Sequence, residues 1–192
     1  MILPLCIYNV LRAWKWRIKA LLAITRPTVC GSPLALQHLR IVGKGKIIFG
    51  RNVQFGWPLA SKYRCTEAYV SPRNAETVIE IGSDCVFNNG ASLCAESDGV
   101  AIKIGNGCLF GPNFSCVDSD FHGVRLCERN SPTRAAVEIG DNCFFGDNVT
   151  VLKGVHLGAR CVVGSHAVVT KSFPEDSLLA GNPAKFIRKI EQ

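Results

Sequence analysis

The sequence has no acidic residue in its first third and contains only 1 Met. No Asp or Glu precedes Glu67, whereas 11 Lys and Arg residues do, and the whole chain has a formal net charge of +7. The other 11 basic residues face all 15 acidic ones, so the rest of the chain carries a charge of −4. The basic character is therefore a property of the N-terminal third and not of the whole surface.

The motifs of several function classes are also missing. There are 10 Cys residues, but no Cys-x-x-Cys pair and no Cys/His spacing typical of a zinc site. Neither a Gly-rich nucleotide loop nor a nucleic-acid-binding motif occurs, and the N-terminus does not have the pattern of a cleavable secretory signal. We therefore expect a cytoplasmic protein with reduced, buried cysteines, no metal and no nucleic-acid partner.

Residues 1–40 are expected to form a helix and a linker. The segment before Pro27 has one face of polar and basic residues three or four positions apart: Asn9, Arg12, Lys15 and Lys19. The other faces are apolar and include Trp14 and Trp16, and charges interrupt the run too often for a membrane span. Two interpretations stay open. The helix lies on the inner face of the cytoplasmic membrane, or its apolar face packs on the protein or a neighbouring subunit.

A six-residue rhythm follows this segment. Large apolar anchors recur without a slip at Ile139, Phe145, Val151, Leu157, Val163 and Val169. Earlier runs of the same pattern have anchors at Ile81, Phe87 and Leu93 and at Ile104, Phe110 and Cys116, with a weaker copy over residues 49–60. A period of six fits neither a helix nor simple alternation. It predicts a parallel β-helix with three flat faces, in which Gly, Asn and Asp occupy the turns.

These repeats and the closing "AGNPAKFIRKI" resemble the hexapeptide-repeat acyltransferases, in particular the branch of maltose, galactoside and polysaccharide O-acetyltransferases. The resemblance covers about residues 41–190. It implies an all-β fold, a left-handed parallel β-helix, together with acetyl-CoA as co-substrate and assembly into a homotrimer. The left hand is implied by the resemblance alone, because general crossover rules favour the opposite hand.

The rhythm stops between Cys116 and Ile139, and His122 is the only histidine in the interruption. Members of the family extrude a loop that carries the catalytic histidine, so the resemblance implies a loop over about residues 117–136 with His122 as general base. A sugar hydroxyl attacks a thioester only if its proton is removed, and imidazole suits that role near neutral pH. Asp118 or Asp120 is expected to hold the ring in the correct tautomer.

The loop departs from the family pattern at one position. Polysaccharide members often read Asp-His-Asp-Phe-His, whereas this chain reads "DSDFH" from Asp118 to His122, so His122 alone has to carry the role. Phe144 stands where the maltose branch has an active-site tryptophan, and Asn88 matches an asparagine that lines the acceptor site. A glutamate that supports the histidine in that branch has no clear equivalent, and Glu128 is the nearest candidate.

The resemblance also implies where acetyl-CoA binds, along the coil in a cleft between two subunits. Backbone groups near Gly146 and Gly164 are expected to hold its pantetheine arm. Its phosphates need hydrogen-bond donors and cations. The matching residues are Thr170, Lys171, Lys185 and Arg188.

The expected function is transfer of an acetyl group from acetyl-CoA to a sugar hydroxyl of a bacterial surface polysaccharide or its precursor. Two other enzymatic functions stay open, N-acetylation of an amino sugar and acetylation of a small molecule, although the extra N-terminal domains usual in those relatives are absent from this sequence. A non-enzymatic scaffold is the third alternative. Zinc enzymes of this shape need three coil histidines, and the four His residues here do not offer that set.

Overall fold

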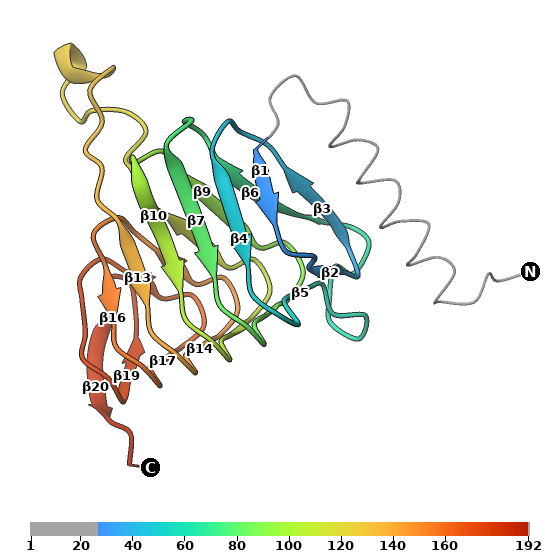
Figure 1. Cartoon of the computed structure of the whole chain (residues 1–192). Helices are drawn as coiled ribbons and strands as arrows, with labels where there is room; N and C mark the ends of the chain where they lie inside the picture. Colours follow the sequence, from blue (N-terminus) through green and yellow to red (C-terminus); the bar gives the residue numbers. More distant parts are fainter. Residues whose placement is uncertain (1–26, 192) are drawn as a thin grey trace, which may run out of the picture.

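The computed structural model describes residues 27–191, which form a three-sided parallel β-helix (Figure 1). Sheet A contains β1 (Thr28–Cys30), β4 (Lys46–Phe49), β7 (Thr77–Ile81), β10 (Gly99–Ile104), β13 (Val137–Ile139) and β16 (His156–Leu157). Sheet B contains β2 (Leu34–Ala35), β5 (Gln54–Phe55), β8 (Val86–Phe87), β11 (Leu109–Phe110), β14 (Phe144–Phe145), β17 (Val162–Val163), β19 (Ser177–Ala180) and β20 (Lys185–Lys189). Sheet C contains β3 (His38–Ile41), β6 (Glu67–Pro72), β9 (Ser92–Ala95), β12 (Ser115–Val117), β15 (Thr150–Val151) and β18 (Val168–Val169).

The chain visits the three sheets in turn, so each strand pairs with the equivalent strand one coil away. The pairs between successive coils are parallel, as in β11 with β14 and β14 with β17. The last strand differs, because β20 turns back at the "AGNPAK" segment and pairs antiparallel with β19. The predicted all-β architecture of hexapeptide coils is therefore confirmed.

The anchors of the six-residue rhythm point into the core, as the period predicts. The anchor side chains from Ile139 to Val169 are at most 3% exposed. Anchors on sheet B form a continuous aromatic stack, with ring centroids 4.7 Å apart for Phe55 and Phe87, 4.3 Å for Phe87 and Phe110, and 4.9 Å for Phe110 and Phe145. Such offset stacking adds to the stabilisation that comes from burying the rings.

The corners explain why turn residues recur at fixed offsets. The residue three positions after an anchor has a left-handed backbone, with φ of 56° at Asn142 and 57° at Asn148. Asn tolerates this region better than most residues because its short side chain bonds locally. At Gly111, one position after its anchor, an added Cβ would lie 2.6 Å from the carbonyl carbon of Gly146, so close stacking of coils requires glycine there.

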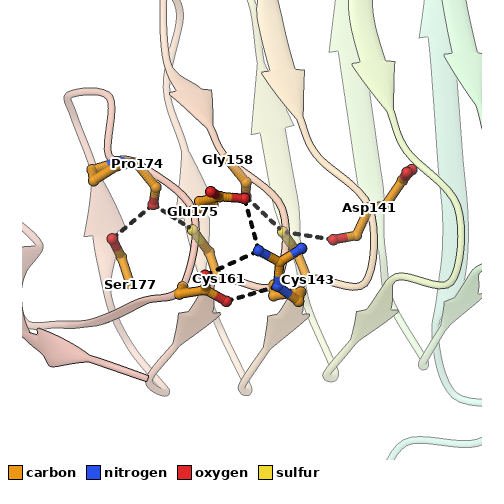
Figure 2. A network of polar contacts seen from close by, with 9 residues as sticks. Asp141, Cys143, Gly158, Cys161, Pro174, Glu175 and Ser177 are labelled. Carbon is orange, nitrogen blue, oxygen red and sulfur yellow. Dashed lines mark hydrogen bonds and ion pairs between the residues drawn. The ribbon is translucent and has the colours of Figure 1, made fainter. Parts of the chain in front are cut away.

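The corner between sheets A and B (the A/B corner) carries a column of buried cysteines in successive coils. The thiols of Cys85, Cys108, Cys143 and Cys161 donate to backbone carbonyls of the next coil, with Sγ···O distances of 3.1, 3.2, 3.3 and 3.2 Å. Figure 2 shows the end of this column, where Ser177 takes the place of cysteine and its hydroxyl donates to Pro174 O at 2.7 Å. These cysteines are buried, small side chains with a structural role, as the sequence predicts.

The β-helix begins earlier than the sequence analysis places it. Strands β1, β2 and the start of β3 lie in the part of residues 1–40 that was expected to be a linker, and all three belong to the coil. The Nδ1 atom of His38 in β3 lies 2.9 Å from the Glu67 carboxylate, which accepts the hydrogen bond. The predicted N-terminal helix with Trp14 and Trp16 lies outside the described residues, so its membrane contact stays a prediction. Over residues 27–191, the structure contains no helix with the length and apolarity to cross a bilayer.

Two segments interrupt the coil. Residues 118–136 connect β12 to β13 at the corner between sheets C and A (the C/A corner) and contain the 3-10 helix η1 (Leu126–Glu128). This segment, hereafter the long loop, projects from the β-helix in Figure 1. The resemblance places the loop at about residues 117–136, and the strands on either side of it end at Val117 and begin at Val137. A shorter insertion, residues 56–66, connects β5 to β6 at the corner between sheets B and C.

Candidate active site

The long loop is attached to the coil through two buried acidic residues. Asp118 is 0% exposed, and its carboxylate accepts hydrogen bonds from the backbone N–H groups of Glu96, at 2.9 Å, and Ser97, at 2.7 Å. Glu96 is 9% exposed, and its Oε1 accepts from the Ser119 hydroxyl at 2.6 Å and from Arg134 Nε at 3.1 Å. Since Ser119 lies near the start of the loop and Arg134 near its end, Glu96 ties both limbs to the turn after β9.

The next two residues of the loop have partners of their own. Asp120 accepts a 2.8 Å hydrogen bond from Lys153 Nζ, which comes from the following coil. Phe121 has a left-handed backbone with φ of 56°, and the guanidinium of Arg73 lies 4.2 Å from its ring centroid. Both contacts hold the segment just before His122 against the coil.

His122 itself is exposed, and within residues 27–191 no hydrogen bond to its ring is observed. The carboxylates of Asp118 and Asp120 are engaged with backbone amides and with Lys153, so in this single chain neither of them contacts the imidazole. Their expected part in orienting the ring, and the role of His122 as general base, stay predictions.

The C/A corner aligns the long loop with two lysines. β12, β15 and β18 are in register at Cys116, Val151 and Val169. Lys153 and Lys171 each follow their anchor by two positions, as Asp118 does, so the three occupy equivalent places in successive coils. Lys171 is exposed, with Nζ 5.5 Å from the Phe173 ring centroid, and Thr170 beside it is also exposed. This corner therefore carries a histidine and the exposed amine of Lys171, which suits an anionic ligand, whereas the Lys153 amine is paired with Asp120.

A separate groove of about 220 Å³ lies on the outer face of sheet B. It brings together the two residues expected to bind the acceptor, Asn88 and Phe144, and adds Trp57, Leu109 and Asp147 to its lining. Trp57, Leu109 and Phe144 are 44%, 48% and 47% exposed, so the groove has an apolar, partly aromatic floor. Aromatic rings beside polar side chains form the kind of concave surface that binds small molecules.

Trp57 is held in the groove by a buried side chain. Asn89 is 0% exposed; its Oδ1 accepts from Trp57 N at 3.1 Å, and its Nδ2 donates to Trp57 O at 3.1 Å and Ser61 O at 2.9 Å. The side-chain amide therefore fixes the start of the 56–66 insertion, which positions the indole on the rim of sheet B.

The remaining residues expected to bind acetyl-CoA do not share one surface in the single chain. Gly146 and Gly164 lie at the corner between sheets B and C, and at Gly146 an added Cβ would meet the Ser165 side chain at 2.6 Å. Coil packing alone thus accounts for that glycine. Lys185 and Arg188 are exposed on β20, at the edge of sheet B. Their contacts with a nucleotide stay predictions.

A larger hollow, about 620 Å³, lies on sheet A over β13, β16 and the turns that follow them. Its lining includes His156, which is exposed and lies 3.3 Å from Glu138, and also Lys103 and Phe173. Because charges of both signs alternate on this open face, we do not assign it the chemistry of the reaction.

His166 lies in a coil turn, as the sequence predicts, and its Nε2 is 3.4 Å from the Asn148 side-chain nitrogen.

The structure adds functional candidates that sequence reasoning missed. Glu96, Arg134 and Trp57 lie outside the six-residue pattern, and none falls in a motif. Glu96 comes 23 residues before Ser119, so only the fold brings them together. The nearest available signal was that acidic Glu96 directly follows the buried β9, a place where a coil turn is expected.

Cys94 and Cys116 lie in the paired strands β9 and β12 beside the long loop. Within the described part of the chain, no three His, Cys, Asp or Glu side chains cluster as metal ligands. Burial raises the pKa of the Cys116 thiol above its ordinary value and also raises the pKa of Cys94, so both thiols stay protonated at neutral pH. Neither is an activated nucleophile.

Two family models match the sequence. One, described as bacterial transferase hexapeptide (six repeats), matches residues 136–171, and another, the hexapeptide repeat of succinyl-transferase, matches residues 101–129. The second half of the long loop separates the two matches. One match includes most of β10 and the other includes β13, and these two strands pair with each other.

Curated relatives include acetyltransferases. The chain is 41% identical over 144 residues to a putative acetyltransferase of Schizosaccharomyces pombe, which covers 74% of this chain and 56% of that protein. It is 32% identical over 114 residues to the galactoside O-acetyltransferase of Lactococcus lactis, covering 58% of this chain and 53% of that protein. The chain thus spans about half the length of the curated relatives it matches.

Solved structures share the fold. The polysialic acid O-acetyltransferase OatWY superposes with a TM-score of 0.63 at 23% identity, over 86% of this chain and 74% of that one. The N-acyltransferase AntD from Bacillus cereus gives a TM-score of 0.61 at 15% identity, over 92% and 88%. These likenesses confirm the fold, a parallel β-helix. The repeat matches and the acetyltransferase relatives lead to one conclusion: the chain belongs to the hexapeptide-repeat family.

Proposed function

We propose that the protein is an acyltransferase that takes an acetyl group from acetyl-CoA. The observation that carries this proposal is the position of the long loop. It interrupts a hexapeptide β-helix with an exposed histidine, at a corner where Lys153 and Lys171 follow in the next coils. Relatives named as acetyltransferases support the reaction class.

The acceptor in this proposal is a hydroxyl of a sugar in a surface polysaccharide or its precursor. His122 removes the hydroxyl proton while the acceptor oxygen bonds to the acetyl carbonyl carbon; the carbon–sulfur bond breaks, and the proton passes to the departing thiolate of CoA. The aromatic floor of the sheet B groove, with Trp57 and Phe144, suits the apolar face of a sugar ring, and Asn88 and Asp147 suit its hydroxyls.

The proposed site is shared between two chains of a homotrimer. In one chain the long loop stands at the C/A corner, whereas the groove lies on sheet B, so His122 of one subunit would serve the groove of another. Exposed Leu109 and Phe144 give sheet B an apolar face that a neighbouring subunit would cover. Light scattering should report three chains, and a fully active monomer would contradict the shared site.

The direct test of activity is release of the CoA thiol from acetyl-CoA against a panel of sugars, oligosaccharides and amino sugars. We expect turnover with hydroxyl acceptors. Turnover only with amino sugars would replace the O-acetyl proposal by N-acetylation. If none of the acceptors in the panel supports thiol release, the sugar assignment is refuted.

Lys171→Ala should weaken acetyl-CoA binding about tenfold through loss of a phosphate contact while changing kcat less. Lys46→Ala, an exposed lysine of β4, is the matched control.

Complementation tests the shared site more sharply. His122→Ala and Phe144→Ala are each expected to be nearly inactive as pure proteins. If subunits of the two variants are mixed by reversible dissociation, about a quarter of the sites would combine an intact loop with an intact groove. Recovery of roughly that share of activity supports the shared site, and no recovery on mixing would contradict it.

A further inference from the structure

The backbone just before His122 is in an unfavourable conformation. Phe121 has φ of 56°, in a region that a bulky L-residue rarely adopts. Most other non-glycine residues with positive φ stand at the regular coil turns, where Asn and Asp prevail. A phenylalanine in this conformation persists only where surrounding contacts specify it.

A buried hydrogen-bonded relay supplies those contacts. The Ser119 hydroxyl accepts from the backbone N–H of Phe121 at 2.9 Å and donates to Glu96 Oε1 at 2.6 Å. The Glu96 carboxylate, ion-paired with Arg134, can only accept hydrogen bonds. The Ser119 hydroxyl proton therefore points to Glu96, and the hydroxyl oxygen is left to accept from the backbone N–H of Phe121. Ser119 is 3% exposed and Glu96 9%, so water competes little for either bond.

The relay is reinforced from two sides. Ser119 and Arg134 form an antiparallel bridge, and Asp120 N donates to Thr133 O at 3.1 Å, which joins the two limbs of the loop. The guanidinium of Arg73 lies over the Phe121 ring, 4.2 Å from its centroid, and restrains that side chain. The His122 ring has no such support of its own among the described residues, so its placement depends on this backbone.

We propose that Ser119 and Glu96 are positioning residues, which set the Phe121 backbone and thereby the direction in which His122 leaves the loop. This proposal rests on the proposed function, in which His122 is the base. It also gives Ser119 a role: the serine that stands where related sequences have a histidine is part of the device that aims the histidine that remains. A displacement of about 1 Å in such a group lowers turnover by up to roughly 10²-fold.

The test combines kinetics with hydrogen exchange on the full-length protein. Ser119→Ala and Glu96→Ala should lower kcat about tenfold or more, with KM for acetyl-CoA within about twofold of wild type. Glu96→Gln keeps an acceptor oxygen for the serine, so it should retain most of the turnover. Arg125→Gln removes an exposed guanidinium that pairs with Glu128 at 3.5 Å in the same loop, and serves as the control with wild-type kinetics.

Hydrogen–deuterium exchange then separates this proposal from the proposed function. The peptide that covers residues 118–123 should exchange about tenfold faster in Ser119→Ala and Glu96→Ala, while peptides from the coil exchange as in wild type. Wild-type exchange in that peptide, a KM effect without a kcat effect, or an equal loss in Arg125→Gln would overturn the relay. If the wild-type protein does not turn over acetyl-CoA, the proposed function fails, and the exchange data alone uphold or overturn the relay.

Discussion

The A/B corner and the C/A corner of this β-helix are built from the same repeat but are used differently. At the A/B corner each coil repeats its neighbour, with one thiol per coil donating to the next carbonyl. At the C/A corner one coil opens into the long loop, which is held by Asp118 and Glu96 in place of repeated contacts. Regular stacking of coils thus stabilises the A/B corner, whereas specific buried polar contacts position the long loop at the C/A corner.

The largest expected effect breaks the regular side of the comparison. Phe110→Ala removes a ring from the middle of the aromatic stack, so the free energy of unfolding should fall by about 3–5 kcal/mol. Urea unfolding followed by circular dichroism measures it. Leu126→Ala in the long loop, where the side chain is 84% exposed, should change stability by less than about 0.5 kcal/mol. Equal losses in the two variants would contradict the division between the regular coil and the long loop.

His122→Ala breaks the other side. Turnover should fall by about 10²-fold or more, the scale for loss of a general base, while the melting temperature and acetyl-CoA binding stay near wild type. His156→Ala, an exposed histidine of sheet A, is the matched control and should keep its turnover. Wild-type kcat in a folded His122→Ala protein would mean that another group acts as base.

A smaller effect sharpens the description of the A/B corner. Cys143→Ala removes the thiol that donates to Gly158 O, which should cost about 1 kcal/mol of unfolding free energy. Cys143→Ser keeps a donor, as Ser177 already does at the end of the same column, and should cost less than alanine. Paired chemical denaturation of the two variants measures the difference. A serine variant that is less stable than the alanine variant would show that shape, and not the hydrogen bond, determines the column.

The smallest effect is a pH dependence. Burial raises the pKa of Cys116 above its ordinary value of 9.0, so in the folded protein this thiol keeps its proton when the unfolded chain would lose it. The resulting stability is present below about pH 9 and declines as the pH rises further, by at most about 1.4 kcal/mol per pH unit for each such thiol. Cys116→Val should make the melting temperature fall less steeply between pH 9 and 10.5. An unchanged slope would assign the alkaline loss to other groups.

The repeating coils could be predicted from the sequence, because the six-residue period indicates which side chains face the core. The anchors from Ile139 to Val169 are buried as expected, and the loop bounds followed from the point where the anchors stop. Strand β1 was missed because residues 28–40 lack clean anchors, and the coil extends over them through pairing with β4.

The candidate site was predictable only where it coincides with a motif. His122 and Lys171 fall in short signatures, whereas Glu96 and Trp57 reach their places through contacts across 23 and 32 residues. Such contacts depend on which coil lies above which, and a local pattern does not encode that. The departure at Ser119 was visible in the sequence, but its meaning required the position of Glu96.

The point where the chain leaves and rejoins the coil has a consequence for how the protein evolves. The loop departs after Val117 and returns at Val137, and β10 pairs with β13 and β12 with β15 as though nothing lay between them. The strand pairing between coils is therefore complete before the loop and continues after it without a change of register. An insertion of this kind behaves as a replaceable cassette: its length and residues can change from one lineage to the next, and with them the chemistry, while the scaffold beneath is inherited whole.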